Sequence, residues 1–158
     1  SDIIFGDQNE WEIASGVPHI PFEALDENYV IDREAYLSYF RKMHRLFPKC
    51  KKMVMAVRNQ IASSHHTLSG LLYDAVEDQL YTTRIYDIQP IVDPMGVGDA
   101  FIAAYIHAHQ KWGDENQYCL DFSLSASAIK NTIPGDQNLV SEEEIISNMT
   151  SSGGRIQR

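Results

Sequence analysis

Apolar residues occur along the chain in two patterns, a continuous run and a helical spacing. Residues 52–58 form a continuous apolar run that ends in Arg58, which is typical of a strand buried on both faces of a sheet. Between Asp32 and Phe47 the apolar residues recur at helical spacing, which predicts a helix capped by Asp32 and stopped by Pro48. Continuous burial favours an α/β arrangement in which helices cover a mostly parallel sheet.

The remaining apolar stretches are shorter and are separated by turn residues. They predict a first strand followed by a helix, a hairpin or flap at the sheet edge, a strand before a glycine-bearing turn, and three further helices. The predicted ranges are strands at 2–5, 68–73, 79–86 and 86–92, and helices at 6–15, 102–112, 121–132 and from 141 onward.

The start of the first helix carries a capping signal. Asp7 is a suitable N-cap, and Glu10 follows three residues later as its capping-box partner. In a capping box, each of the two side chains accepts a hydrogen bond from the backbone N–H of the other residue. This structural role is sufficient to explain the spacing of the two acids.

The stretch 92–101, Val-Asp-Pro-Met-Gly-Val-Gly-Asp-Ala-Phe, joins a predicted strand directly to a predicted helix. Glycines let the backbone approach a ligand closely, and the first N–H groups of a helix lack partners within the helix. Together with the positive end of the helix dipole, these donors form an anion site. Asp99 stands beside that site and can accept a proton from an attacking hydroxyl, which suggests phosphoryl transfer. Helix capping by Asp99 is the structural alternative.

Composition narrows the choice of partners and compartment. The 158 residues are 44% hydrophobic and fit one domain, 1–158, with a polar tail at 151–158. The net charge of −9 argues against a nucleic-acid partner, and no apolar run is long enough to span a membrane. Cys50 and Cys119 lie far apart without metal-ligand spacing, so reduced structural thiols in a cytoplasmic protein are expected.

The glycine stretch resembles a known signature. D-P-M-G-V-G-D-A-F is similar to the D-T-x-G-A-G-D-A-F run of the ribokinase-like sugar kinases of the phosphofructokinase B type. It is neither a Walker A loop nor a Rossmann fingerprint, because no G-K-[ST] follows and the third glycine is missing. The resemblance implies that Gly96, Val97 and Gly98 form a backbone nest around the transferred phosphate. It also implies that Asp99 is the base that activates the sugar hydroxyl.

A second run resembles one branch of that family. Residues 128–140, A-I-K-N-T-I-P-G-D-Q-N-L-V, are similar to the K-H-T-I-P-G-D-x-N-L-V run of 2-keto-3-deoxygluconate kinases, with Asn131 where histidine is common. The resemblance implies that Asp136 lies near the acceptor sugar and that Ser127 and Asn131 lie near adenine. Arg58, at the end of its strand, would reach toward nucleotide phosphate. A turn at Pro-Gly-Asp and a surface arginine are the structural alternatives.

The resemblance adds a second possible role for the first helix. In these kinases a strand followed by N-x-x-E places polar groups near magnesium and the nucleotide phosphates, and here Asp7 takes the Asn position and Glu10 the Glu position. An Asp in place of Asn brings a negative charge close to phosphate. Helix capping therefore remains the alternative for Asp7.

Taken together, the two runs imply a ribokinase-like α/β fold with a partial central sheet flanked by helices. The chain would be the C-terminal nucleotide-binding and catalytic portion of a kinase, without the N-terminal half and its lid. The implied reaction moves the γ-phosphate of ATP, with Mg²⁺, to the terminal hydroxyl of 2-keto-3-deoxygluconate, a small sugar acid. The need for a monovalent cation stays open.

Two alternatives to this function also stay open. The chain could belong to a fructokinase- or ribokinase-like kinase for another sugar, or it could be an inactive nucleotide-binding or interaction module. If the chain is part of a 2-keto-3-deoxygluconate kinase, the isolated chain is expected to be inactive. It is also expected to self-associate, as a homo-oligomer, through the face that the missing half would cover.

Overall fold

The computed structural model of the chain describes residues 3–18, 32–62, 65–88, 97–113, 115–130 and 141–150. Two helices lie between the first and second strands, four strands then follow one another, and three helices follow the last described strand. In order, the elements are β1 (Ile3–Asp7), α1 (Gln8–Ser15), α2 (Arg33–Leu46), β2 (Lys52–Ala62), β3 (His65–Asp74), β4 (Gln79–Thr82), β5 (Tyr86–Ile88), α3 (Val97–Trp112), α4 (Asn116–Lys130) and α5 (Glu142–Thr150).

The strands form one mixed sheet. Its order is β1-β2-β3-β4, with β5 also paired to β3. β1 and β2 are parallel, with Ile3 opposite Lys52 and Asp7 opposite Ala56. The other described pairings are antiparallel.

The expectation of a mostly parallel sheet therefore holds only for β1 and β2 among the described strands. The lengths of the connections explain the difference. The chain passes through α1 and α2 between β1 and β2, whereas two residues, 63–64, separate β2 from β3. A parallel pair needs a long crossover connection, and a short link permits only an antiparallel pair.

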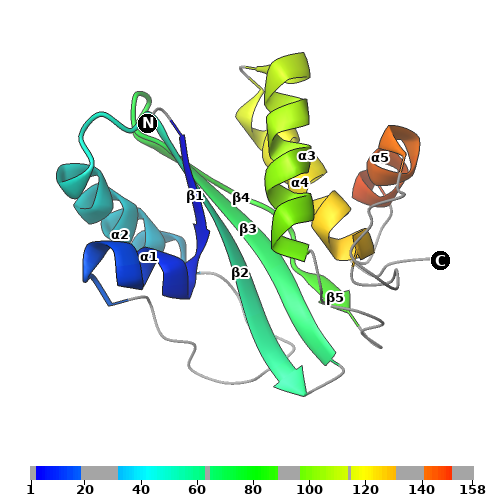
Figure 1. The fold of residues 1–158 in the computed structure, drawn as a ribbon, viewed down its shortest axis with the longest axis horizontal. Coiled ribbons are helices and arrows are strands. Elements are labelled where there is room, and N and C mark those ends of the chain that lie inside the picture. The colour runs from blue at the N-terminus through cyan, green and yellow to red at the C-terminus, as the bar shows by residue number, and fades with distance from the viewer. Residues whose placement is uncertain are drawn as a thin grey trace.

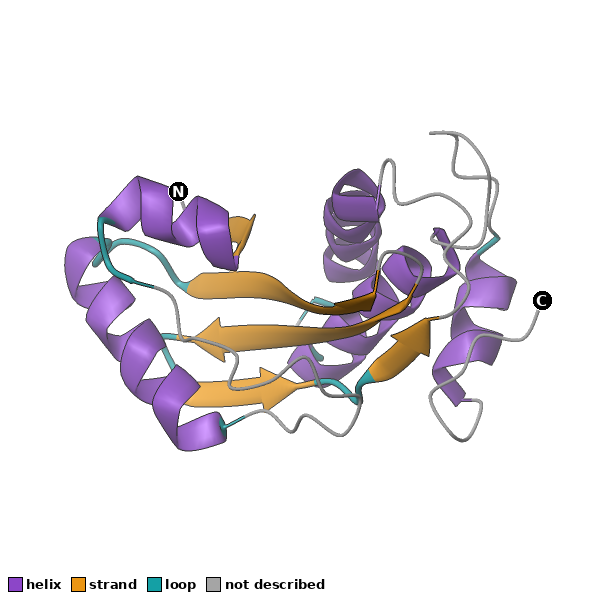
Figure 2. Ribbon diagram, turned by 90° about the horizontal axis from the view of Figure 1, so that it is seen from below, coloured by secondary structure: helices purple, strands orange, loops and turns teal. Residues whose placement is uncertain are grey.

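Helices cover both faces of the sheet. Figures 1 and 2 show α1 and α2 on one face and α3, α4 and α5 on the other. On β2, Met53 and Met55 pack with α1 and α2, while Val54 between them packs with the other three helices. The continuous apolar run thus reflects burial on both faces, as the sequence predicted.

Both predicted N-caps of the first two helices are confirmed. The Asp7 carboxylate accepts a hydrogen bond from the Glu10 N–H at 2.9 Å, and the Glu10 carboxylate accepts one from the Asp7 N–H at 2.8 Å. Asp32 caps α2 by accepting from the N–H of Ala35 at 3.1 Å. Gly16, with φ of 73°, ends α1 in the left-handed conformation that glycine adopts without strain.

The hairpin of β3 and β4 is tied to α4 by a buried carboxylate. Asp74 is 5% exposed and accepts hydrogen bonds from the N–H groups of Val76 and Glu77 at 3.0 and 3.1 Å. It also accepts one from the Asn116 side-chain amide at 2.9 Å. The same carboxylate therefore shapes the hairpin turn and anchors the first residue of α4. This contact accounts for α4 beginning at Asn116 rather than at residue 121.

The hairpin turn also holds an ion pair that makes stability depend on pH. Arg41 of α2 donates two hydrogen bonds to the Asp78 carboxylate, at 3.0 and 2.8 Å, and the Tyr73 hydroxyl donates a third at 2.5 Å. The Arg41 hydrogen bond, followed by that of Tyr73, lowers the pKa of Asp78 from 3.8 to about 2. A carboxyl whose pKa is lower in the folded state stabilises the fold above its ordinary pKa, and this stabilisation is lost as the pH falls toward 2.

We therefore expect Asp78→Asn to remove part of the acid sensitivity of the fold. Asparagine tolerates the left-handed backbone at this position, where φ is 54°, so the turn conformation is kept. In urea unfolding followed from about pH 4 down to about pH 2, the wild-type midpoint should fall more steeply than that of the variant, because this range lies between the two pKa values of Asp78. Parallel curves for the two proteins would show that the pair does not contribute.

Candidate active site

The carboxyl ends of β1 and β2 and the first turns of α1 and α3 lie at the same end of the sheet (Figure 1). The parallel register fixes part of this arrangement, because Asp7 at the end of β1 stands opposite Ala56, and Arg58 follows two positions later on β2. In open α/β sheets, ligands bind outside the carboxyl ends of the strands. This end of the sheet is therefore the candidate active site.

The first turn of α3 contains most of the glycine signature. α3 begins at Val97 rather than at residue 102, so Val97, Gly98 and Asp99 are helical, while Gly96 lies outside the described residues. Gly98 and Asp99 are exposed. A side chain at Gly98 would meet no atom within 4 Å, so space is open beside the helix start. The N–H groups of this turn are thus approachable by an anion, as helix starts generally allow.

Gly6, near the end of β1, allows α1 to pack close to the sheet. A Cβ atom on Gly6 would lie 3.0 Å from both Cδ1 and Nε1 of Trp11 and 3.3 Å from Oε2 of Glu10. Glycine therefore allows the indole ring to cover the strand end beside the capping box. Trp11 is 3% exposed, and its Nε1–H has no hydrogen-bond partner among the described residues.

The two acids predicted to lie near magnesium are the capping pair. Each uses one carboxylate oxygen for a backbone N–H, Oδ1 of Asp7 and Oε2 of Glu10, so each keeps a second oxygen for another contact. Within the described residues no group of three or more His, Cys, Asp or Glu side chains could hold a metal ion by itself. Mg²⁺ commonly takes one or two carboxylates and completes its shell with water and phosphate oxygens, and this donor set fits that mode.

The other predicted contacts are only partly described. Arg58 lies on β2, but its side chain is outside the description, as is that of Val97. Ser127 is 1% exposed within α4, so its hydroxyl lies inside the helical layer. Asn131 and Asp136 fall outside the described residues. Their proximity to adenine and sugar stays a prediction.

Two buried residues, Trp11 and Lys130, were not singled out from the sequence. Trp11 belongs to an ordinary apolar pattern. The signal for its contact with the strand was the glycine at position 6, which lacks a side chain that would collide with the Trp11 ring. Lys130, the last residue of α4, is fully buried although lysine seldom is. The sequence feature that could have drawn attention to Lys130 is its position at the start of the K-N-T-I-P-G-D run.

Cys50 and Cys119 are both buried and form no disulfide, and burial raises the pKa of the Cys119 thiol. Of the helices in the described ranges, none has the length and apolarity needed to cross a bilayer.

Comparison with solved structures identifies the fold. The chain is similar to 2-dehydro-3-deoxygluconokinase from Thermotoga maritima, with 28% identity over 95% of this chain and 41% of that one, at a TM-score of 0.78. It is also similar to a PfkB family carbohydrate kinase from Listeria grayi, with 25% identity over 95% and 41% of the two chains, at a TM-score of 0.75. The solved structures that this chain resembles are PfkB-family carbohydrate kinases.

The likeness to these kinases confirms the ribokinase-like fold and supports the phosphotransferase family that the two sequence runs implied. The chain spans about two fifths of the length of these kinases, since 41% of each is covered. No protein-family model and no curated protein matches the sequence.

The close approach at Gly6 can be tested by adding one methyl group. Gly6→Ala should lower the free energy of unfolding by about 1–3 kcal/mol, because the new Cβ would overlap the buried Trp11 ring. Gly98→Ala is the matched control, since the space beside Gly98 is open, and its effect should stay within about 0.5 kcal/mol. Urea unfolding of both variants measures the difference, and equal effects would contradict the packing described for β1.

Proposed function

We propose that the chain carries the nucleotide-binding and catalytic part of an ATP-dependent kinase for 2-keto-3-deoxygluconate, which is the same compound as 2-dehydro-3-deoxygluconate. The observation that carries this proposal is the exposed first turn of α3, with Gly98 and Asp99, at the carboxyl end of the parallel strands. The likeness to the Thermotoga maritima kinase, at 28% identity, supports the choice of sugar.

In the proposed reaction, Asp99 accepts the proton of the terminal hydroxyl of the sugar acid. The hydroxyl oxygen then forms a bond to the γ-phosphorus of ATP while the bond from that phosphorus to the β–γ bridging oxygen breaks, and ADP leaves. The backbone N–H groups of residues 96–98 stabilise the negative charge on the transferred phosphoryl group. Positioning and charge stabilisation account for most of the catalysis in reactions of this class.

Mg²⁺, when bound, would neutralise part of the phosphate charge. Glu10 and Asp7 would hold it through the carboxylate oxygens that the capping box leaves available. The positive end of the α1 dipole lies at the same place, and it favours the anionic phosphates that accompany the ion. A comparison of the reaction in sodium and potassium salts would test whether a monovalent cation also takes part.

The nucleotide and sugar contacts form the rest of the proposal. Arg58 would meet nucleotide phosphate, Ser127 and Asn131 would flank adenine, and Asp136 would contact the sugar. The register supports the role of Arg58, because it lies two positions beyond the residue opposite Asp7. The buried position of Ser127 favours an indirect role for it, through the packing of α4.

A kinase for another sugar is the second candidate. The Listeria grayi relative matches at almost the same TM-score, 0.75, and is described only as a carbohydrate kinase. An inactive nucleotide-binding or interaction module remains the alternative outside catalysis, since the chain spans 41% of the two kinases. Fold alone does not fix the substrate.

We also propose a cytoplasmic protein, as two buried thiols that form no disulfide suggest. The isolated chain is proposed to be inactive or nearly so and to form homo-oligomers. β1 supports self-association, because it pairs with only one neighbour among the described strands. A monodisperse monomer by light scattering at high concentration would contradict this part of the proposal.

The base is tested by Asp99→Asn in a kinase chain that contains these residues together with the rest of the fold. The rate of ATP-dependent phosphorylation of 2-keto-3-deoxygluconate should fall by about a hundredfold or more, because the amide cannot accept the proton. Glu143→Gln is the matched control, since Glu143 is also an exposed acid in the first turn of a helix, α5. It should leave the rate unchanged.

The results separate the mechanism from the substrate. Full activity of Asp99→Asn would exclude Asp99 as the base. If the parent chain ignored this sugar acid and phosphorylated fructose or ribose instead, the choice of sugar would be wrong while the proposed chemistry stood. Absence of transfer to any sugar would favour the non-catalytic module.

A further inference from the structure

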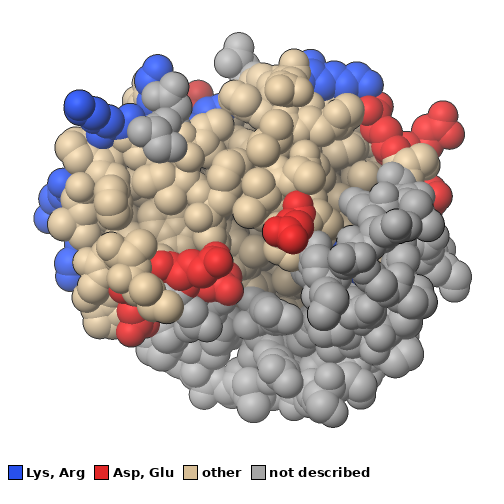
Figure 3. Space-filling view, in the orientation of Figure 1, with Lys and Arg blue, Asp and Glu red and all other residues tan. Residues whose placement is uncertain are grey.

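One carboxylate ties the first turn of α5 to α3. Oε1 of Glu142 accepts a hydrogen bond from the Lys111 ammonium at 2.7 Å, and its Oε2 lies 2.8 Å from Nε2 of His107. Because His107 and Lys111 are four positions apart, they lie on the same face of α3. Figure 3 shows Lys or Arg atoms directly beside Asp or Glu atoms at its upper right, over the region where Figure 1 shows α3 and α5. We call His107, Lys111 and Glu142 the α3–α5 clamp.

Aromatic contacts hold both clamp residues of α3 in place. The His107 ring stacks on Phe122 of α4, with 5.8 Å between the ring centroids, and makes a T-shaped contact with Trp112. The Lys111 ammonium lies 5.1 Å from the centroid of the same Trp112 ring. An ordinary surface ion pair contributes little, partly because two long side chains must be ordered to form it. Here the aromatic contacts supply part of that order, so the clamp fixes α5 more firmly than an isolated pair would.

Both partners keep the Glu142 carboxyl ionised. The hydrogen bond from Lys111, followed by that from His107, lowers the pKa of this carboxyl below its ordinary value. The clamp therefore carries a full negative charge on α5 at neutral pH, which is the form that attracts the Lys111 ammonium.

Further contacts join α5 to α4. The hydroxyl of Ser125, which is fully buried, donates a hydrogen bond to the Ile145 carbonyl at 2.8 Å, and the Asn148 side-chain amide donates one to the Ser125 oxygen at 3.0 Å. The Ile145 side chain is buried in the same cluster as Tyr105 of α3. These contacts hold the body of α5, and the clamp holds its first turn.

The clamp residues of α3 lie on the helix that presents the proposed base. Asp99 is in the first turn of α3, and His107 and Lys111 follow about two and three turns later. Between them, Ala104 and Tyr105 are buried in the core, so α3 is held against the sheet as one unit. The clamp thus fixes the start of α5 relative to Asp99.

The start of α5 is also one end of the segment that carries the proposed adenine and sugar contacts. In the sequence, residues 131–140 connect the end of α4 to Ser141. The Ser141 hydroxyl caps α5 by accepting a hydrogen bond from the Glu144 N–H at 3.2 Å, and Glu142 is the next residue. At the other end of the segment, Lys130 is fully buried. Both ends are therefore held by the helical layer.

We propose that the α3–α5 clamp positions the substrates for the kinase reaction, because Glu142 keeps the start of α5 at a fixed distance from Asp99. This inference rests on the proposed function, and it adds three positioning residues that touch neither substrate. Loss of the clamp should weaken the binding of both substrates, since the segment 131–140 loses one fixed end. It should leave the chemical step nearly unchanged, since Asp99 and the N–H groups of α3 stay in place.

The test measures kcat and the KM values for ATP and 2-keto-3-deoxygluconate in the kinase chain used for Asp99→Asn. Glu142→Gln should raise both KM values about threefold or more and change kcat by less than about twofold, because it removes the charge that both partners share. A loss of stability alone would lower the active fraction, and with it kcat, at unchanged KM. The split between KM and kcat therefore separates positioning from a merely structural role.

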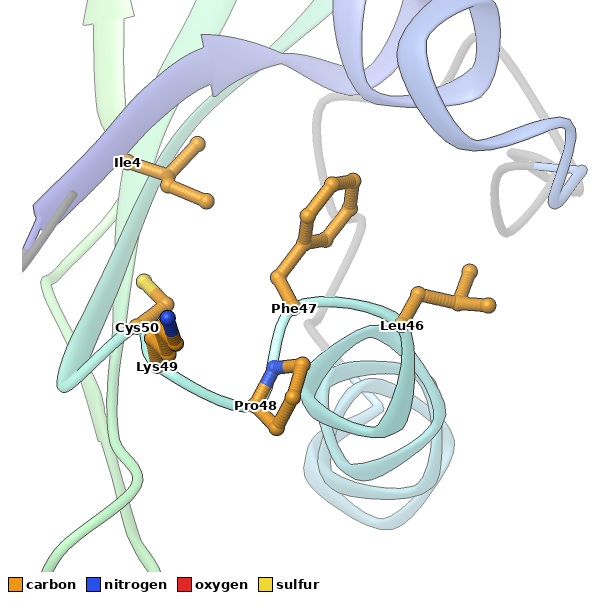
Figure 4. A pocket seen from close by; sticks show the side chains of 6 residues that line it. All are labelled: Ile4, Leu46, Phe47, Pro48, Lys49 and Cys50. Atoms are coloured by element: carbon orange, nitrogen blue, oxygen red, sulfur yellow. The ribbon is translucent and has the colours of Figure 1, made fainter.

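Matched variants show whether the clamp itself is responsible. Glu143→Gln removes the neighbouring charge of the same helix turn, so it reproduces any effect on the α5 dipole and should leave both KM values unchanged. Lys111→Gln should raise them about twofold, whereas Lys111→Arg keeps the charge and should restore them. Lys49→Gln should have no effect, since Lys49 is an exposed lysine that lines the apolar cavity on the α2 side of the sheet (Figure 4).

Each of four results would overturn the inference. Wild-type KM values in Glu142→Gln, or equal changes in Glu142→Gln and Glu143→Gln, would remove the clamp from the account, while an inactive Asp99→Asn would leave the proposed function standing. A lower kcat at unchanged KM would show that the clamp serves stability alone. Absence of transfer from ATP to any sugar in the parent chain would reject the proposed function and the inference with it.

Discussion

The fold depends on the burial of β2 and β3 between two layers of helices. Each strand contributes side chains alternately to the two apolar clusters, so neither layer can be removed without exposing the other side of the same strands. The crossover through α1 and α2 makes β1 parallel to β2, and this in turn aligns their carboxyl ends. The candidate active site is a consequence of that alignment, because it collects the first turns of α1 and α3 at one end.

The carboxyl end of the parallel strands has the chemistry of an anion site. It combines helix starts, an exposed acid and a capping pair with carboxylate oxygens to spare, which suits phosphate and a divalent cation.

The sequence was sufficient to predict features that depend on residues close together in the chain. The caps at Asp7 and Asp32 were predicted correctly, because a capping bond joins residues only a few positions apart. The continuous apolar run of β2 correctly predicted burial on both faces, but burial carries no information on strand direction. The antiparallel pairing with β3 therefore could not be predicted from it.

The start of α3 and the environment of Gly6 show where sequence reasoning falls short. The glycines of the signature suggested a turn up to residue 101, whereas burial of Ala100 and Phe101 in the core extends the helix back to Val97. The contact between Gly6 and the Trp11 ring depends on three-dimensional packing at the strand end. The family resemblance predicted the fold and the phosphotransferase class, which the structural relatives confirm.

The most direct test of the central claim is to map where MgATP binds on this 17.9 kDa chain. Titration of the ¹⁵N-labelled protein, followed through its amide resonances, reports each residue that the nucleotide approaches. The account predicts that the largest shifts occur at Gly98 and Asp99 and at residues 6–10, with little change at 46–50. Shifts confined to residues away from the carboxyl ends of β1 and β2 would contradict it.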